Sequence, residues 1–364
     1  MRKHEQSGGA GPGTGEAGAV AVAMSGGIDS TLAAALLAEQ GREVFGVTAV
    51  LTDEDTPFAS RRGVRAARAA ADAVGIRHVV VDLRDAFARD VIEDFLDAYL
   101  SGRTPCPCAV CNARIKFGRL RRKAEALGAR RFATGHYAAV RRDDAGGIHL
   151  HRGRDAARDQ SYFLFGLDPD SLAAALFPLG DWSKARVREQ ARRRNLPLLD
   201  RGESRELCFV AGAHGDWIEA RRPGASRPGE LVDRQGRVLG LHRGMHRYTV
   251  GQRRGLGLAA GHRAYVTALD APRNRVVLGA RRDAMRRRLR VERPHWIAEA
   301  PAPGRFRALA QIRYHHAAAA CEAERRSDGS LTVVFDEEQF AITPGQAAVL
   351  YRGDEVLGGG WIAG

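Results

Sequence analysis

Apolar and polar positions in the first half of the chain alternate in a way that predicts strands and helices in turn. Short apolar runs at 20–24, 43–50, 78–82 and 131–134 predict buried strands, and amphipathic stretches at 31–39, 61–74, 86–100 and 115–127 predict helices. Gly41, Gly75 and Gly128 follow three of these helices, as glycine does at helix ends. The alternation predicts an α/β domain, a doubly wound parallel sheet with helices on both faces. Such sheets bind ligands at the carboxyl ends of their strands.

The pattern changes after about residue 210. Short alternating segments at 230–233, 237–239, 265–269 and 275–278, interrupted by Pro, Gly and Arg, predict a small β domain. A further set at 306–314, 331–335, 347–351 and 355–357 predicts a second β module that resembles a barrel. We therefore expect a disordered Gly-rich tail at 1–18, a catalytic domain at 19–212, a central β domain at 213–284 and a barrel-like domain at 285–364.

The composition is that of a globular protein. The 364 residues are 44% hydrophobic, which suits roughly two or three domains. The sequence has no apolar run of about 18 residues that would predict a transmembrane helix, and residues 1–18 lack the apolar centre of a signal peptide. We therefore expect a cytoplasmic protein, in which the odd number of cysteines argues against a disulfide scaffold.

The net charge adds a weak indication of function. It is +14, from 57 Lys and Arg against 43 Asp and Glu, and a basic protein suits a polyanion such as nucleic acid. Only Lys3, Lys116, Lys123 and Lys184 are lysines, however. A GC-rich genome also encodes such an Arg- and Ala-rich chain, so charge alone favours nucleic-acid binding only slightly.

A Gly-rich loop joins the first predicted strand to the first predicted helix. It consists of Met24, Ser25, Gly26, Gly27, Ile28, Asp29, Ser30 and Thr31. Two glycines allow successive N–H groups to face an anion, and the helix that follows adds its positive end. The lysine of a Walker A loop is missing, so we expect the loop to hold a departing pyrophosphate rather than to transfer the terminal phosphoryl group. The alternative is an ordinary glycine turn with Asp29 or Ser30 as the helix cap.

Four cysteines indicate a second kind of chemistry, one that involves sulfur or a metal. Cys106, Cys108 and Cys111 lie in a loop with two prolines before a helix, and Cys208 follows about a hundred residues later. A helix N-terminus favours thiolate at Cys111, and two thiols that meet can pass sulfur and close as a disulfide. The alternatives are a zinc or iron–sulfur site at Cys106, Cys108, Cys111 and Cys208, or inert buried thiols.

The loop at 24–31 resembles that of the PP-loop ATP pyrophosphatases. A longer series of ordered motifs resembles the tRNA-specific 2-thiouridylases (tRNA-uridine 2-sulfurtransferases, the MnmA/TrmU family). These motifs lie at 25–30, 102–118, 133–137, 159–164, 177–180, 207–210, 248–257, 312–314, 343–346 and 357–360. The resemblance implies ATP-dependent 2-thiolation of the wobble uridine of tRNA, with adenylation of the C2 oxygen and sulfur from a cysteine persulfide.

The same resemblance assigns roles to residues. It implies Cys111 as nucleophile and Cys208 as persulfide carrier. The ATP-binding residues that it implies are Ala23, Met24, Ser25, Gly26, Gly27, Ile28, Asp29, Ser30, Ala49 and Gly135. The tRNA-binding residues that it implies are Cys106, Pro107, Cys108, His136, Arg158, Asp159, Gln160, Arg313, Tyr314 and Gln346. ATP, Mg²⁺, tRNAs for Lys, Glu and Gln, and a cysteine desulfurase or sulfur-relay protein are the implied cofactors and partners.

Five positions depart from the family pattern. Cys106 replaces the usual Asn, Cys108 stands where some members carry Asp, Arg158 replaces Lys, Ala49 stands where Met is frequent, and Ala23 where Gly is frequent. Three alternatives stay open for Cys108: an acid/base group, a ligand of zinc or an iron–sulfur cluster together with Cys111 and Cys208, or neither role. Two other functions stay open: a PP-loop enzyme that adenylates a small molecule, and a non-catalytic RNA-binding protein that holds a metal.

Overall fold

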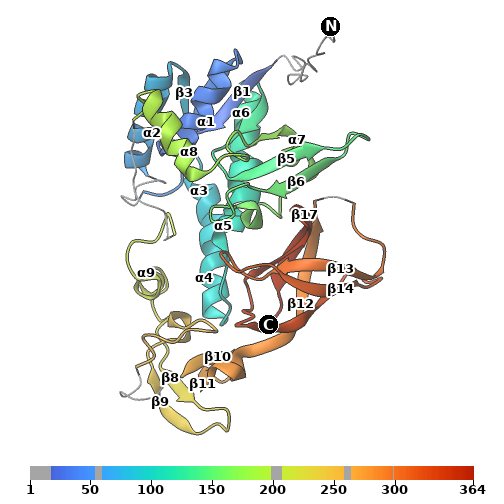
Figure 1. Cartoon of the computed structure of the whole chain (residues 1–364). Helices are drawn as coiled ribbons and strands as arrows, with labels where there is room; N and C mark the ends of the chain where they lie inside the picture. The colour runs from blue at the N-terminus through green and yellow to red at the C-terminus, as the bar shows by residue number, and fades with distance from the viewer. Residues whose placement is uncertain (1–17, 54–59, 198–206, 258–263, 298) are drawn as a thin grey trace.

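The computed structural model describes residues 18–53, 60–197, 207–257, 264–297 and 299–364. The predicted tail lies outside these residues except for Gly18. The described chain forms three β-sheets with helices gathered around the first of them (Figure 1). None of its helices is both long and apolar enough to cross a membrane.

The first sheet is parallel, with the strand order β3-β2-β1-β4-β7. Its strands are β1 (Ala19–Ala23), β2 (Val44–Val50), β3 (Arg77–Asp82), β4 (Ala129–Ala133) and β7 (Ala175–Leu176). Both faces of β1 are buried: Val20 and Val22 pack with the helices α1 (Ile28–Glu39) and α2 (Arg61–Val74), and Ala21 packs with residues of the opposite layer. The predicted doubly wound sheet is therefore confirmed.

Two long helical stretches form that opposite layer. The first comprises α3 (Arg84–Phe87), the π-helix η1 (Ala88–Ile92) and α4 (Glu93–Leu100), and the second α5 (Pro107–Val110), the π-helix η2 (Cys111–Leu120) and α6 (Arg121–Ala126). We expected the second helix to begin at residue 115, but it begins at Pro107, because proline fits the first position of a helix. A Cβ at Gly118 would lie 2.9 Å from the Ala113 carbonyl, so the π-turn requires glycine there. Mid-helix π-turns often mark functional sites.

The remaining helical elements connect the sheets. They are η3 (Ser161–Phe163), α7 (Pro169–Ala174), α8 (Lys184–Arg193), α9 (His214–Arg221), η4 (Met245–Arg247) and η5 (Arg281–Ala284).

The second sheet has the order β10-β11-β8-β9. Its strands, β8 (Gly229–Val232), β9 (Val238–His242), β10 (Tyr265–Asp270) and β11 (Arg275–Gly279), lie close to the predicted segments. Leu231, Val266, Val276 and Leu278 form its core together with Met245 and Tyr248.

The third sheet is a closed barrel with a hairpin attached. β12 (Met285–Trp296), β15 (Leu331–Phe340), β14 (Ala319–Arg325), β13 (Gly304–Gln311), β16 (Ala347–Arg352) and β17 (Glu355–Ile362) follow one another, and β12 pairs with β17 to close the ring. The hairpin β5 (Ala138–Arg142)–β6 (Ile148–Arg152), which continues from β4, joins the barrel beside β17. We did not predict β12, because its exposed face carries a run of arginines that hides its buried Leu289 and Val291.

Substitution of Gly358 tests the barrel closure. A Cβ at Gly358 would clash with the His295 carbonyl at the β12–β17 junction. We expect Gly358→Ala to lower the free energy of unfolding by about 1–3 kcal/mol, measured by urea denaturation. Gly166→Ala is the control, since Gly166 has no positive φ and its Cβ would meet only the Ala113 Cβ, at an ordinary contact distance of 3.6 Å. Equal losses in both variants would contradict the steric explanation.

Candidate active site

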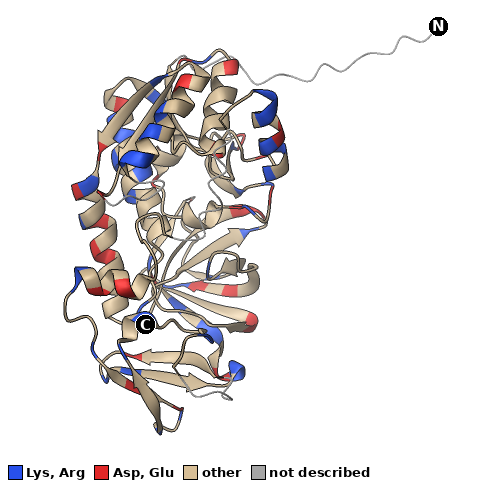
Figure 2. Cartoon of the chain, turned by 90° about the vertical axis from the view of Figure 1, so that its left-hand side faces the viewer, with Lys and Arg blue, Asp and Glu red and all other residues tan. Residues whose placement is uncertain are grey.

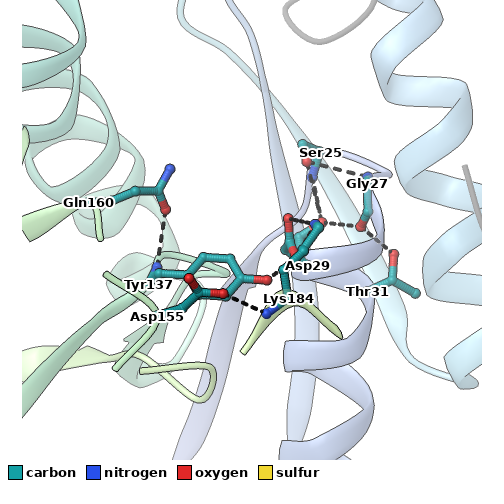
Figure 3. Close-up of polar contacts among 9 residues, drawn as sticks. Ser25, Gly27, Asp29, Thr31, Tyr137, Asp155, Gln160 and Lys184 are labelled. Atoms are coloured by element: carbon teal, nitrogen blue, oxygen red, sulfur yellow. Dashed lines mark hydrogen bonds and ion pairs between the residues drawn. The ribbon is translucent and has the colours of Figure 1, made fainter. Parts of the chain in front are cut away.

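The Gly-rich loop lies at the carboxyl end of β1, as expected, and leads into α1 (Figure 3). Gly26 has a φ of +75°, and a Cβ there would lie 2.6 Å from the Ala66 carbonyl carbon, so only glycine fits between the loop and α2. The Ser30 and Thr31 hydroxyls donate to the Gly27 carbonyl at 3.0 and 2.9 Å, and the Ser25 N–H donates to Ser30 Oγ at 3.2 Å. The loop is thus fixed by its own side chains.

The other predicted nucleotide-binding positions surround this loop. Met24 and Ile28 are buried, so a nucleotide would meet their backbone rather than their side chains. Ala23 and Ala49 lie partly buried near the carboxyl ends of β1 and β2. Gly135 follows β4, and a Cβ there would lie 2.8 Å from the Ser30 nitrogen. The structure therefore brings these positions together at the sheet edge where nucleotide-binding folds hold phosphates.

Asp29 of this loop belongs to a charged cluster whose other members, Tyr137 and Lys184, we did not predict. Asp29 accepts hydrogen bonds from the Tyr137 hydroxyl at 2.8 Å and from Lys184 Nζ at 2.7 and 2.8 Å (Figure 3). The sequence did carry a signal for Lys184, because lysine occurs at only four positions of this Arg-rich chain.

The cysteine loop is held by the two β domains. Gln346, predicted to contact tRNA, donates to the Thr104 and Pro105 carbonyls at 3.1 and 2.8 Å. The Thr104 N–H donates to the Pro344 carbonyl at 2.8 Å, and its hydroxyl donates to Thr249 Oγ1 at 3.3 Å. Contacts from the barrel region and the central region thus fix residues 104–105, the segment directly before Cys106.

The cysteines differ in exposure. Cys106 and Cys111 are buried, Cys208 is half-buried, and Cys108 is exposed. Cys208 is held in place by its neighbour Phe209, whose ring packs edge-on against Phe87, Phe95 and Trp217 at centroid distances of 5.3–5.4 Å.

The expectation that Cys111 is a thiolate is wrong for the resting site. The residue lies in the second turn of a continuous helix that begins at Pro107, and burial raises the pKa of its thiol to about 11. Burial raises the pKa of Cys208 to about 12, with further contributions from the charges of Cys111 and Cys108. Desolvation thus outweighs the helix dipole, and both thiols are neutral at pH 7.

Lys116 is the cation of this site, a role that we did not predict. Its charge lowers the pKa of Cys111 and of Cys208 against the larger effect of burial. Burial and the same charge hold the pKa of His136 well below its usual value, which keeps the imidazole neutral. One ammonium therefore acts on both key thiols and on His136, whose Nδ1 lies 2.7 Å from Thr134 Oγ1.

Several residues predicted to contact tRNA also make bonds within the protein. Asp159 is buried and accepts hydrogen bonds from Arg152 and Ser161, and Gln160 Oε1 accepts from the Tyr137 N–H at 3.1 Å. Arg313 donates to the Phe340 carbonyl at 2.9 Å, and the Tyr314 ring lies 4.4 Å from that of Phe163. Pro107 is buried, and Arg158 is half-buried beside this group.

The cysteines do not fit a metal site. The described residues contain no group of three or more His, Cys, Asp or Glu side chains placed to hold a metal ion. We therefore derive no step through a zinc ion or a cluster at Cys108, Cys111 and Cys208.

Comparison with known proteins agrees with this geometry. Family models match residues 18–212 ("tRNA methyl transferase HUP domain"), 217–280 ("tRNA methyl transferase PRC-barrel domain") and 286–362 ("Aminomethyltransferase beta-barrel domain"). The tRNA-specific 2-thiouridylase MnmA of Moorella thermoacetica is 48% identical over 94% of this chain and 98% of its own length. The chain belongs to the tRNA-specific 2-thiouridylase family.

Other members of the 2-thiouridylase family match equally broadly. Those of Carboxydothermus hydrogenoformans and Geobacter metallireducens are 46% and 44% identical, each over 94% of this chain and 97% and 96% of their own length. The family models carry methyltransferase descriptions, whereas these three relatives carry the thiouridylase name. A crystal structure of a 4-thiouridine synthetase–RNA complex with bound ATP is 16% identical and covers 57% of this chain and 50% of that one, with a TM-score of 0.35.

Alkylation tests the neutral state of the thiols. Because only thiolate reacts and the pKa of Cys208 is about 12, its rate of alkylation by iodoacetamide should rise about tenfold per pH unit from pH 7 to 10 without a plateau. Peptide mass spectrometry measures the rate at each cysteine. A rate at Cys208 that levels off between about pH 9 and 10, as for an ordinary thiol with a pKa near 8.5, would contradict the raised pKa.

Proposed function

We propose that this chain catalyses ATP-dependent 2-thiolation of the wobble uridine of tRNA. One observation carries the proposal. Cys111 and Cys208, 97 residues apart in sequence, lie close enough to interact electrostatically, and the charge of Lys116 lowers the pKa of both thiols. A PP-loop enzyme that adenylates a small molecule would have no use for such a pair. The family membership supports the same substrate and reaction.

The first step activates a poor electrophile. The C2 oxygen of uridine attacks the α-phosphorus of ATP, and pyrophosphate leaves. The loop at 24–31 holds the phosphates, with backbone N–H groups and the N-terminus of α1 facing the negative charge. AMP, now bonded to the C2 oxygen, is a good leaving group.

The second step transfers sulfur. The terminal sulfur of a persulfide on Cys208 attacks C2 and displaces AMP. Cys111 then attacks the Cys208 sulfur, so that the S–S bond breaks, the transferred sulfur stays on C2, and a Cys111–Cys208 disulfide forms. An external thiol must reduce this disulfide before the next cycle. Lys116 favours the anionic form of both sulfur groups at the moment of attack.

Magnesium fits this site as a partner of the nucleotide. Mg²⁺ binds through one or two carboxylates together with substrate phosphates, and Asp29 lies directly after the loop. Bound there, it would neutralise charge on the phosphates.

Binding of tRNA would use groups from the catalytic domain and from the barrel region. Lys and Arg residues are spread over the described chain (Figure 2), which suits a long polyanion. We assign the target base to Cys106, Pro107 and Cys108, because Cys108 is exposed beside the buried nucleophile. His136, Arg158, Asp159, Gln160, Arg313, Tyr314 and Gln346 would support the surrounding RNA. The proposed substrates are the tRNAs for Lys, Glu and Gln, met in the cytoplasm, and a cysteine desulfurase or relay protein would supply the sulfur.

Nucleoside mass spectrometry tests the activity. We expect unmodified tRNA incubated with the protein, Mg-ATP, cysteine and a cysteine desulfurase to gain 2-thiouridine at the wobble position. Formation of AMP without dependence on tRNA would instead support a small-molecule ligase.

Two substitutions test the roles of the cysteines. Cys111→Ser and Cys208→Ser should each reduce thiolation at least about a hundredfold, because serine cannot carry or release sulfane sulfur, while ATP and tRNA binding persist. Cys321→Ser is the matched control: this thiol is buried in the barrel, where it donates to the Ala308 carbonyl, as a hydroxyl would. Wild-type activity in either of the first two variants would refute the assignment.

A further inference from the structure

The phosphate-binding loop has an ammonium group beside it that its own sequence does not provide. Lys184 Nζ lies 2.7 and 2.8 Å from the two carboxylate oxygens of Asp29, a residue 155 positions earlier in the chain. Asp29 belongs to the first turn of α1, directly after the glycines of the loop. Figure 3 shows the Lys184 side chain reaching the loop from a neighbouring element.

Contacts of both the backbone and the side chain of Lys184 determine the position of this ammonium. Ser183 caps α8, and the Lys184 backbone N–H donates to Asp155 Oδ2 at 2.9 Å, so the first residue of α8 is fixed. Nζ lies 6.0 Å from the centre of the Tyr137 ring, and the Tyr137 hydroxyl donates to the same Asp29 carboxylate. The Lys184 side chain is 15% exposed. A cation that is ordered and partly desolvated acts more strongly on an anion than one on a free surface.

We propose that Lys184 supplies the phosphate-binding cation that a Walker A loop carries within its own sequence. An ammonium has three N–H donors, so it can serve both Asp29 oxygens and still offer one donor to a phosphate oxygen. A guanidinium paired with the carboxylate would hold its remaining donors in the plane of that pair, whereas the ammonium can turn its third donor towards a phosphate out of that plane. This need explains a lysine at 184 in a chain that uses arginine at nearly every other basic position.

The role follows from the charge that the reaction creates. When the bond between the α-phosphorus and the bridging oxygen breaks, the electron pair leaves with pyrophosphate. A fixed ammonium stabilises this growing charge without forming a bond, and Asp29 and Tyr137 hold it in place. Lys184 would therefore bind ATP and pyrophosphate but contribute little to the binding of AMP, which lacks the β- and γ-phosphates.

The test compares three ligands. With Mg²⁺ present, Lys184→Met should weaken the binding of ATP and of pyrophosphate about tenfold to a hundredfold, as expected for loss of a charge-assisted contact, while AMP affinity changes less than about twofold. Isothermal titration calorimetry of the full chain measures all three. Lys123→Met is the matched control, the same change at an exposed lysine of α6, and should leave all three affinities unchanged.

Other results would overturn the proposal. If the affinities for ATP, pyrophosphate and AMP all fall equally, Lys184 only holds α8 against α1. If none of the three affinities falls, Lys184 has no part in nucleotide binding. Should Lys184→Met fail to fold, Lys184→Gln replaces it, because the neutral amide can still donate to Asp29. The inference rests on the proposed function for its reaction, but these measurements need no tRNA and no sulfur, so failure of thiolation and failure of this site are separable.

Discussion

The cysteine loop is held from outside the domain that contains it. Gln346 and Pro344 of the barrel region, together with Thr249 of the central region, bind the backbone and side chain of residues 104–105. Two prolines stiffen the same loop, which then begins the helix that carries Cys111 and Lys116. The position of the cysteine loop therefore depends on contacts between segments that are more than a hundred residues apart.

Two residues that we propose for tRNA binding also make bonds within the protein. Gln346 donates to backbone carbonyls of the cysteine loop, and Gln160 accepts from the Tyr137 N–H. Loss of either side chain would disturb the protein as well as any contact with RNA. A variant at either position would therefore report on both the structure and the binding.

The fold was largely predictable, because local patterns set it. Buried strands such as β1, and glycines at helix ends, gave the parallel sheet and its ligand-binding edge. Prediction failed where long-range packing determines the state of a residue or an element. Burial raises the pKa of Cys111 more than the helix dipole lowers it, and the exposed arginines of β12 obscure the alternation of its buried residues. Lys116 lies within the motif at 102–118 and Lys184 just after the motif at 177–180, but neither motif indicates an electrostatic role for its lysine, and only the scarcity of lysine distinguished them.

The hairpin β5–β6 connects the first sheet to the barrel. Its first strand continues from β4 through residues 134–137, the segment that packs on the phosphate loop, and its second strand extends the barrel beside β17. The barrel is thus joined to the nucleotide site by a short lever of sheet hydrogen bonds rather than by a flexible tether. A displacement of the barrel relative to the first sheet would therefore reach residues 134–137, and through them the glycine-rich loop, by way of the backbone of this hairpin.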